Sequence, residues 1–324
     1  MRHAPGVPPG QLCYYFCVAP RSERTSILLV ALGASLWGTD VVLRQPLTHT
    51  LRAGTIVFLE HAILTAVLLP VLVQTRHLWR EMRGRQWAAL ATVAWGGSAV
   101  ATLCFTQAVK IGSPTSAVLL QKVQPLVAAL LARAWLGERA DRIYWLLLAV
   151  AMAGAYLISF GDGPWLAPFS VERSAAAAFA LAAALLWAAS TVCGRYLSAA
   201  LPFSALTAMR IALALPLLAL FELFSGNLRG LRAGHALPLL WLALVPGLAA
   251  LLLYYRGLRG ATASRAAIAE LCFPATAVLL SWLVLGSRLA PLQALGFVLL
   301  WAAVLRLHST AGVVSSGTSA ASGA

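Results

Sequence analysis

Charged residues are scarce in this chain of 324 residues. They make up 10% of it, and only ten residues are Asp or Glu. Soluble domains carry about 25% charged residues, so a soluble protein of this composition would have too little polar surface to face water. The hydrophobic residues, 60% of the chain, recur in blocks from residue 26 to residue 306. This distribution argues against a soluble protein with one membrane anchor and predicts a chain that crosses a membrane many times.

Cysteine is also scarce, and its spacing carries no metal or redox signal. Of the five cysteines, Cys104, Cys193 and Cys272 lie in apolar blocks, where cysteine behaves as a small hydrophobe. Cys13 and Cys17 have no further ligands nearby, and no disulfide framework is visible. The sequence contains no Walker A, HExxH or GxSxG motif. We therefore expect no cofactor, no metal site and no direct use of ATP.

Long apolar blocks are what the chain has in abundance. Their ranges are 26–45, 55–74, 86–108, 114–135, 143–161, 174–197, 204–224, 236–256, 262–284 and 289–307. A helix needs about 20 apolar residues to cross a bilayer and satisfies its own backbone there. The blocks are too long for barrel strands and do not alternate. We predict an all-α integral membrane protein with ten transmembrane helices.

Basic residues set the expected orientation. The formal net charge is +14, which in a soluble protein would suggest nucleic-acid binding. Here Lys and Arg lie mostly between the apolar blocks, where they determine topology, so we expect no nucleic-acid partner. They are more frequent in the segments that share a side with the N-terminus, and densest in RHLWREMRGR, 76–85. This bias predicts that both termini are cytoplasmic and that the protein lies in the cytoplasmic (inner) membrane.

The chain repeats itself. The repeated positions are Lys110, Pro125 and Gly137 in the first half and Arg259, Pro274 and Gly286 in the second, each pair 149 residues apart, together with Trp37 and Trp187, 150 residues apart. Each half holds five predicted helices, an odd number, so the second half must enter the membrane upside down. Inverted repeats are common in secondary transporters, with the substrate site near midplane between them. We predict two inverted five-helix repeats.

Three stretches carry a family resemblance. They are LWGTDVVLR at 36–44, AVKIGSPTSAVLLQKVQPLVAALLARAWLGER at 108–139, and GLRGATASRAAIAELCFPATAVLLSWLVLGSR at 257–288. Over about residues 26–307 the chain resembles the drug/metabolite transporter superfamily, namely ten-helix exporters with two EamA-type repeats. The resemblance implies cytoplasmic termini and export or exchange of a small metabolite. We therefore expect five segments along the chain: 1–25 (N-terminal cytoplasmic), 26–161 (first repeat), 162–173 (periplasmic linker), 174–307 (second repeat) and 308–324 (disordered cytoplasmic tail).

The chain departs from the family pattern at two places. Repeats of this family usually carry Arg in their second helix, and Arg210 matches this in the second repeat, whereas the first repeat has Glu60. The second repeat also has Ser287 where the signature has Glu.

Several polar residues fall inside the apolar blocks. They are Asp40, Glu60, His61, Lys122, Arg210, Arg265 and Glu270. A charge at the centre of a membrane helix costs about 2.5–3.5 kcal/mol on insertion scales, so such residues usually face a cavity or a polar partner. Asp40 either pairs with Arg44 one helical turn away or faces the cavity. Glu60 and Asp40 are proton-coupling candidates, since a buried carboxyl can be neutralised. We expect His61 to bond Thr65 or a neighbouring helix, and Tyr254 and Tyr255 to lie in the interfacial aromatic belt.

The stretch AVLLQKVQPLVAALLA, 117–132, has the densest polar cluster. Pro125 removes a backbone hydrogen bond at residue 121 and predicts a kink, and Pro274 predicts the same in the second repeat. Glu270 occupies the position that matches Gln121. Lys122 either contacts an anionic solute or pairs with Glu60 or Glu270. The predicted substrate-binding residues are Trp37, Asp40, Glu60, Gln121, Lys122, Gln124 and Glu270.

The sequence therefore predicts a secondary active transporter, an exporter of small metabolites or drug-like solutes, coupled to protons or to an exchanged solute. Its expected partners are a small-molecule solute and membrane lipid, and it is expected to be a monomer or homodimer. The alternative is a polytopic membrane enzyme that acts on a lipid-borne substrate with Asp40, Glu60 and His61 as acid/base groups. No motif supports that alternative.

Overall fold

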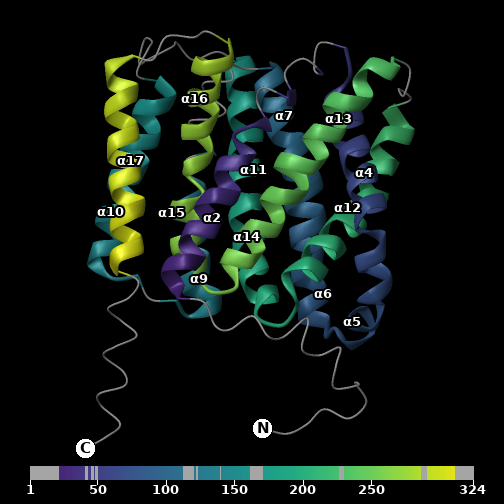
Figure 1. Ribbon diagram of the computed structural model, residues 1–324, viewed down its shortest axis with the longest axis horizontal. Coiled ribbons are helices and arrows are strands. Elements are labelled where there is room, and N and C mark those ends of the chain that lie inside the picture. Colours follow the sequence, from purple (N-terminus) through teal and green to yellow (C-terminus); the bar gives the residue numbers. More distant parts are fainter. Residues whose placement is uncertain are drawn as a thin grey trace, which may run out of the picture.

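The computed structural model describes residues 22–40, 43–44, 47, 50–111, 120–121, 123–138, 140–160, 171–225, 230–285 and 290–310. Within these ranges every regular element is helical, and the helices form an elongated bundle (Figure 1). In chain order they are α2 (Glu23–Trp37), α4 (Ala53–Gln74), α5 (Arg76–Glu81), α6 (Gly84–Ala91), the π-helix η1 (Thr92–Val100), α7 (Ala101–Ile111), α9 (Gln124–Leu136), α10 (Arg142–Phe160), α11 (Val171–Ser198), α12 (Phe203–Ser225), the 3-10 helix η2 (Ala233–His235), α13 (Ala236–Leu242), the π-helix η3 (Ala243–Ala249), α14 (Ala250–Leu258), α15 (Ala263–Ala269), α16 (Cys272–Leu285) and α17 (Pro291–Thr310).

The helices are those of a multi-pass membrane protein. Among the described residues, six helical segments are long and apolar enough to cross a membrane: 53–74, 84–108, 175–198, 203–224, 233–258 and 263–284. Shorter apolar helices cover 124–136, 142–158 and 291–307. Large apolar side chains also point outward: Phe224 is 83% exposed and Leu223 is 77% exposed. Such a surface is stable against lipid tails, whereas in water it would be an aggregation site.

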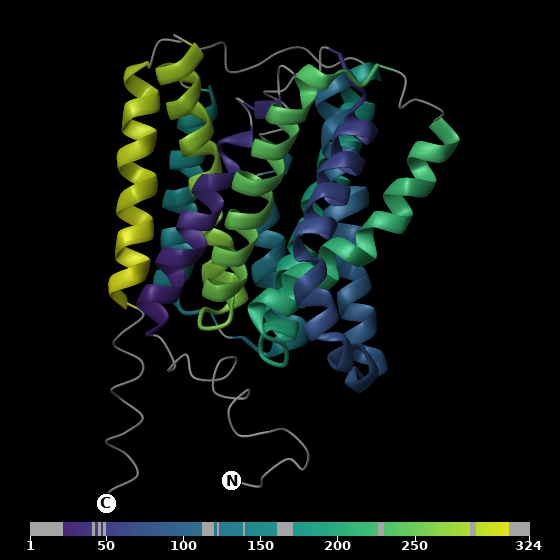
Figure 2. The same cartoon turned by 45° about the vertical axis from the view of Figure 1, so that its right-hand side comes forward.

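Helices from the two halves of the chain pack against each other in matching pairs. α10 packs on α17, and α4 packs on α12. α2 packs on α14, while α11 packs on η1 and α7. The pair α10 and α17 stands at one side of the bundle in Figures 1 and 2, with α4, α5 and α6 on the opposite side. When each helix is replaced by its counterpart in the other half of the chain, the same set of helix pairs results.

Glycines allow the closest of these approaches. A Cβ added at Gly154 on α10 would lie 2.8 Å from the carbonyl oxygen of Gly296 on α17. A Cβ added at Gly257 on α14 would lie 2.5 Å from the carbonyl oxygen of Ser26 on α2. Small residues at such crossings let membrane helices gain van der Waals contact, because lipid supplies no hydrophobic force between them.

Four of the long helices are irregular at matching places. The π-helices η1 and η3 end at Val100 and Ala249, which are 149 residues apart like the repeated sequence positions. Helix α15 ends at Ala269 and α16 begins at Cys272, with a turn between them. Pro274 has no N–H to donate to the Glu270 carbonyl, and the Phe273 N–H donates to it instead, at 3.1 Å. The fourth helix of the first half is interrupted in the same way at Val123, just before Pro125.

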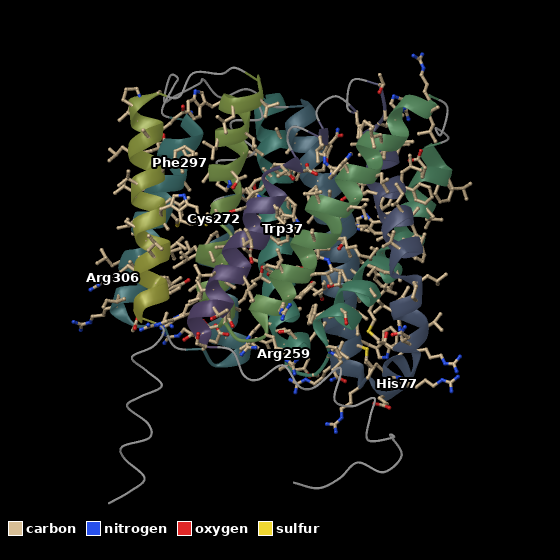
Figure 3. The ribbon with its side chains drawn as sticks, in the orientation of Figure 1. Trp37, His77, Arg259, Cys272, Phe297 and Arg306 are labelled. Atoms are coloured by element: carbon tan, nitrogen blue, oxygen red, sulfur yellow. The ribbon has the colours of Figure 1, made fainter. Side chains whose placement is uncertain are left out.

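Basic side chains gather at one end of the bundle. His77, Arg259 and Arg306 all lie at the end where α2 begins and α17 ends (Figure 3). Helix α13 begins at the other end (Figure 1), where Thr50 Oγ1 is 3.1 Å from His235 Nε2. Segments that the positive-inside bias assigns to one side of the membrane therefore meet at one end of the molecule.

Candidate functional site

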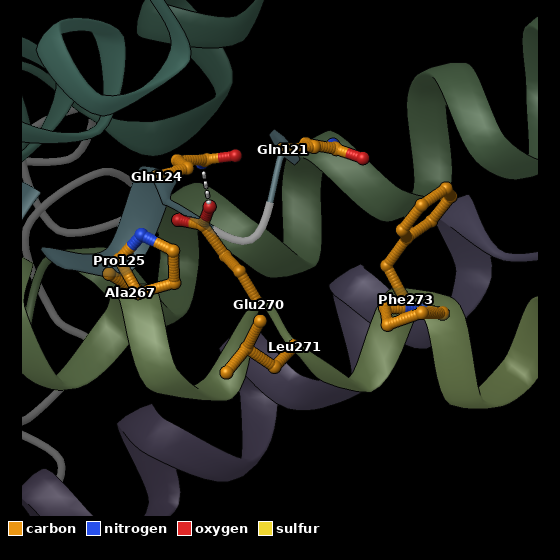
Figure 4. Close-up of a pocket in the computed structure, with 8 residues that line it drawn as sticks. Gln121, Gln124, Pro125, Ala267, Glu270, Leu271 and Phe273 are labelled. Atoms are coloured by element: carbon orange, nitrogen blue, oxygen red, sulfur yellow. Dashed lines mark hydrogen bonds between the residues drawn. The ribbon is translucent and has the colours of Figure 1, made fainter. Parts of the chain in front are cut away.

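A small cavity lies where α9 meets the turn between α15 and α16 (Figure 4). It is lined by Gln121, Gln124, Pro125, Ala267, Glu270, Leu271, Phe273 and Pro274. Its volume of about 20 Å³ has room for little more than one water molecule. In this conformation the cavity is too small for a metabolite.

Glu270 is the centre of the polar network at this cavity. It caps the C-terminus of α15, so its side chain leaves the helix at the interruption caused by Pro274. Gln124 Nε2 donates to Glu270 Oε2 at 2.7 Å, and this bond joins the two halves of the chain (Figure 4). Thr191 Oγ1 on α11 donates to Glu270 Oε1 at 3.1 Å. Among the described residues, no cation lies within ion-pair distance of this carboxylate.

Tyrosine side chains extend this network across α14. The Tyr254 hydroxyl lies 2.9 Å from Glu270 Oε1 and 3.2 Å from Thr191 Oγ1. The Tyr254 ring packs against Trp37, with the ring centroids 5.0 Å apart. Both Tyr254 and Tyr255 are buried, at 3% and 0% exposure, so their predicted place in an interfacial belt is wrong. Tyr254 faces α2 at Gly33 and Trp37, and Tyr255 faces Gly194 of α11 and Arg210 of α12, so helix packing on different sides of α14 buries the two rings.

Arg210 lies beside the second of these tyrosines. Its Nη1 donates to the Tyr255 hydroxyl at 2.8 Å, its Nε donates to Ser98 Oγ, and its guanidinium carbon is 5.8 Å from the Tyr255 ring centre. All these partners are neutral, so hydrogen bonds and the ring face replace the water that the guanidinium loses.

A second charged cluster contains the two predicted proton-coupling candidates. Arg44 donates to both carboxylate oxygens of Asp40, at 2.6 and 2.7 Å, and to Glu60 Oε2 at 2.9 Å. The pair of Asp40 with Arg44, which the spacing allowed as one alternative, is therefore formed. The structure adds Glu60 to it from α4, so the two carboxylates share one guanidinium.

His61 follows Glu60 but does not take part in this cluster. Its Nδ1 lies 2.9 Å from the Val57 carbonyl oxygen, and its Nε2 is buried without a partner. Thr65 donates to the main-chain carbonyl of His61 and not to its ring. The ring is thus held within its own helix, unlike the expected bond to Thr65 or to another helix.

The predicted site residues fall into two groups in the structure. Gln121, Gln124 and Glu270 line one cavity, and Trp37 reaches that network through Tyr254. Asp40 and Glu60 form the second group, joined by Arg44. Lys122 lies outside the described residues. Thr191 and Tyr254 are additional members that sequence reasoning missed. The only signal for Thr191 was its place one turn after Trp187, the counterpart of Trp37.

No metal site is apparent in the described part of the chain, which contains no group of three or more His, Cys, Asp or Glu that could hold an ion. The chemistry of the cavity is instead that of hydrogen bonding: one carboxylate, two amides, and hydroxyl donors from Thr191 and Tyr254.

Comparisons with known proteins cover nearly the whole chain. The model of the EamA-like transporter family matches residues 24–160 and again residues 174–307. The riboflavin transporter ImpX of Fusobacterium nucleatum subsp. nucleatum is 30% identical over 288 residues, which are 86% of this chain and 96% of that protein. A solved structure described only as a crystal structure of a protein superposes with a TM-score of 0.71 at 18% identity, covering 86% of this chain and 94% of the other. This last likeness concerns the fold alone.

Proposed function

The chain belongs to the EamA-like transporter family, and we propose that it is a secondary active transporter that moves a small solute across the cytoplasmic membrane by alternating access. The family and the transporter among its relatives point to membrane transport of small solutes and not to an enzyme. The observation that carries the proposal is the bond from Gln124 to Glu270. It joins the two matched segments at the point where both helices are interrupted before a proline. Sites between repeats with broken helices are typical of secondary transporters.

The proposed architecture is ten transmembrane helices in two inverted repeats, 26–161 and 174–307, joined by the linker 162–173. Each predicted block overlaps a described helix. The exchangeable helix pairs and the matching π-helices support the duplication. The separation of predicted inside and outside segments to opposite ends of the bundle (Figure 3) supports the inversion. We propose that segments 1–25 and 308–324 are cytoplasmic, as the basic residues at that end favour.

Cysteine labelling tests this topology. Arg83 and Arg232 are both exposed and lie in connections predicted on opposite sides of the membrane. We expect Arg83→Cys to react with an impermeant maleimide only from the cytoplasm, and Arg232→Cys only from the other side. Labelling of both from the same side would contradict two intact inverted repeats.

We propose a solute that combines a planar ring with polar groups, with riboflavin as the first to test. The transporter from Fusobacterium nucleatum supports riboflavin. Phe273 lines the cavity together with amide and carboxylate groups, and Trp37 packs on Tyr254, which is bonded to Glu270. Concave sites of this mixture orient a flat ligand by a few hydrogen bonds. Because the present cavity admits little more than water, binding requires a more open conformation.

Purified protein tests the solute directly. A ligand that binds only the folded protein raises its melting temperature, by an amount that corresponds to about 2.7 kcal/mol at a hundredfold excess over Kd. We expect riboflavin to raise the melting temperature of the parent, and the Gln124→Ala variant to lose most of that rise when each protein is compared with its own ligand-free melting temperature. Flux of riboflavin into liposomes then separates transport from binding. A panel of nucleosides, amino acids and sugars serves as the comparison. If one of these raises the melting temperature and riboflavin does not, riboflavin is not the solute and that compound takes its place.

The energy source we propose is the proton gradient or an exchanged solute. The cycle of alternating access is reversible, so the gradients set the net direction, and export is the direction that the family resemblance implies. Glu270, Glu60 and Asp40 are the proton-carrier candidates. Glu270 is the first of them, because Arg44 engages the other two.

A further inference from the structure

The start of α15 is fastened to the first half of the chain by Glu138. This residue follows α9 in the connection to α10. Its Oε1 accepts the Ala263 N–H at 2.9 Å, and its Oε2 accepts the Ser264 N–H at 3.1 Å and the Ser264 hydroxyl at 2.7 Å. One carboxylate thus takes three donors at the N-terminus of a helix, where negative charge is favoured.

Two further contacts fasten the same region. Arg265, in the first turn of α15, pairs with Glu23 of α2 at 2.8 Å. Arg195 of α11 donates to the Arg259 carbonyl oxygen at 2.7 Å, just before α15 begins. The contacts of Glu138 and Glu23 both run between the two matched halves of the chain. Separating the halves at this end of the bundle requires breaking both.

Helix α15 links this attachment to the candidate solute site. It has seven residues, from Ala263 to Ala269, which corresponds to about 10 Å of rigid helix. Glu138 holds one end, and Glu270 caps the other. Ala267, in between, lines the cavity. A movement of α15 at Glu138 is therefore transmitted to the cavity wall.

The sequence positions that match Glu138 and Arg265 in the other half carry different residues. The position 149 residues after Glu138 is Ser287, and the position 149 residues before Arg265 is Ser116. Both acidic and basic members of the attachment are thus replaced by serine in the matching sequence positions. A hydrogen bond to a charged group contributes more than one between neutral groups, and a serine at these positions cannot supply the charge that Glu138 and Arg265 bring to their contacts.

We propose that Glu138 is a positioning residue that holds α15 so that the solute site stays closed toward the Glu138 end of the bundle in the resting protein. The inference rests on the proposed transport function, and it adds which residue sets the resting conformation. Because the matching sequence positions carry serine, the charged contacts of Glu138 and Arg265 have no equivalent there, and the resting protein exposes its site more readily at that other end. Solute entering from the Glu138 end must first break the attachment.

The test is the accessibility of Ala267→Cys in the full chain. Membrane vesicles of both orientations are treated with an impermeant thiol reagent, and labelling of the parent without the Ala267→Cys change is subtracted. We expect slow labelling from the Glu138 end. Adding Glu138→Ala should speed labelling from that end on the order of tenfold, since three bonds to a carboxylate are lost. Ser264→Ala, which removes one bond, should give a smaller rise in the same direction.

The matched control is Glu81→Ala, an exposed carboxylate on α5 at the same end of the bundle; it should leave the labelling rate unchanged. Unchanged labelling in Glu138→Ala and Ser264→Ala would overturn the proposal. An equal rise from both membrane sides would also overturn it, because that is the signature of general loosening. If Glu138→Ala does not insert, Ser264→Ala decides. The readout needs no transported solute, so absence of flux in the parent would reject the proposed function and leave this test intact.

Discussion

Replacing Glu270 by Gln should abolish solute movement driven by a pH gradient, down to the level of protein-free liposomes, while solute exchange persists. A glutamine cannot take up or release a proton, whereas Glu270 is a partly buried carboxylate whose described partners are neutral donors. The fold should tolerate the change. The oxygen of the introduced amide can accept from Thr191 and Tyr254, and the Gln124 amide can rotate to present its own oxygen to the introduced NH₂ group. The melting temperature should therefore stay at or above that of the parent.

Glu222→Gln is the matched control, since Glu222 is also a carboxylate bonded to a threonine: it is buried, 6% exposed, and accepts from Thr55 of α4 at 2.8 Å. It should retain pH-driven flux. Normal pH-driven flux in Glu270→Gln would remove Glu270 as the carrier. The same measurement on Glu60→Gln and Asp40→Asn would then identify which of the two carboxylates bound to Arg44 takes the role.

Replacing Arg44 by Met should lower the free energy of unfolding by about 3–5 kcal/mol, the range seen when one partner of a buried ion pair is removed. Asp40 and Glu60 would be left as two carboxylates without their shared cation. We expect poor insertion and a lower melting temperature. Adding Glu60→Gln to Arg44→Met should restore part of the loss, because the uncompensated charge is reduced.

Arg80→Met is the comparison for this change, because Arg80 is an exposed arginine on α5; it should melt like the parent. If Arg44→Met inserts and melts normally but loses solute affinity, Arg44 is a solute contact and the structural role is wrong. If the double variant Arg44→Met, Glu60→Gln is no more stable than the single one, then Glu60 does not depend on Arg44 for its stability.

The sequence by itself determined the membrane class, the family and much of the cavity lining. An apolar block of about 20 residues predicts a membrane-spanning helix, because in lipid a helix is one of the few structures that hydrogen-bond all of their own backbone groups. The polar residues near Pro125 and Pro274 could be grouped because proline disrupts a helix at a fixed offset, four residues earlier. This local rule placed Gln121 and Glu270 at interruptions before any partner was known, and both line the cavity.

Only the tertiary structure decided which polar groups meet. The free-energy cost of placing a carboxylate in lipid identified Glu60 and Glu270 as residues that need polar partners. Which partner each one finds depends on how its helix is rotated and which helix it crosses. Arg44 reaches Glu60 on the next helix, and Glu270 meets Tyr254 of the preceding helix α14 and Thr191 of α11, which is 79 residues away in the chain. Tyrosines are typical of the interfacial belt, but here Tyr254 is buried against α2 and Tyr255 against α11 and α12. The sequence shows which polar groups are unfavourable in lipid, whereas the helix crossings determine which partners stabilise each of them.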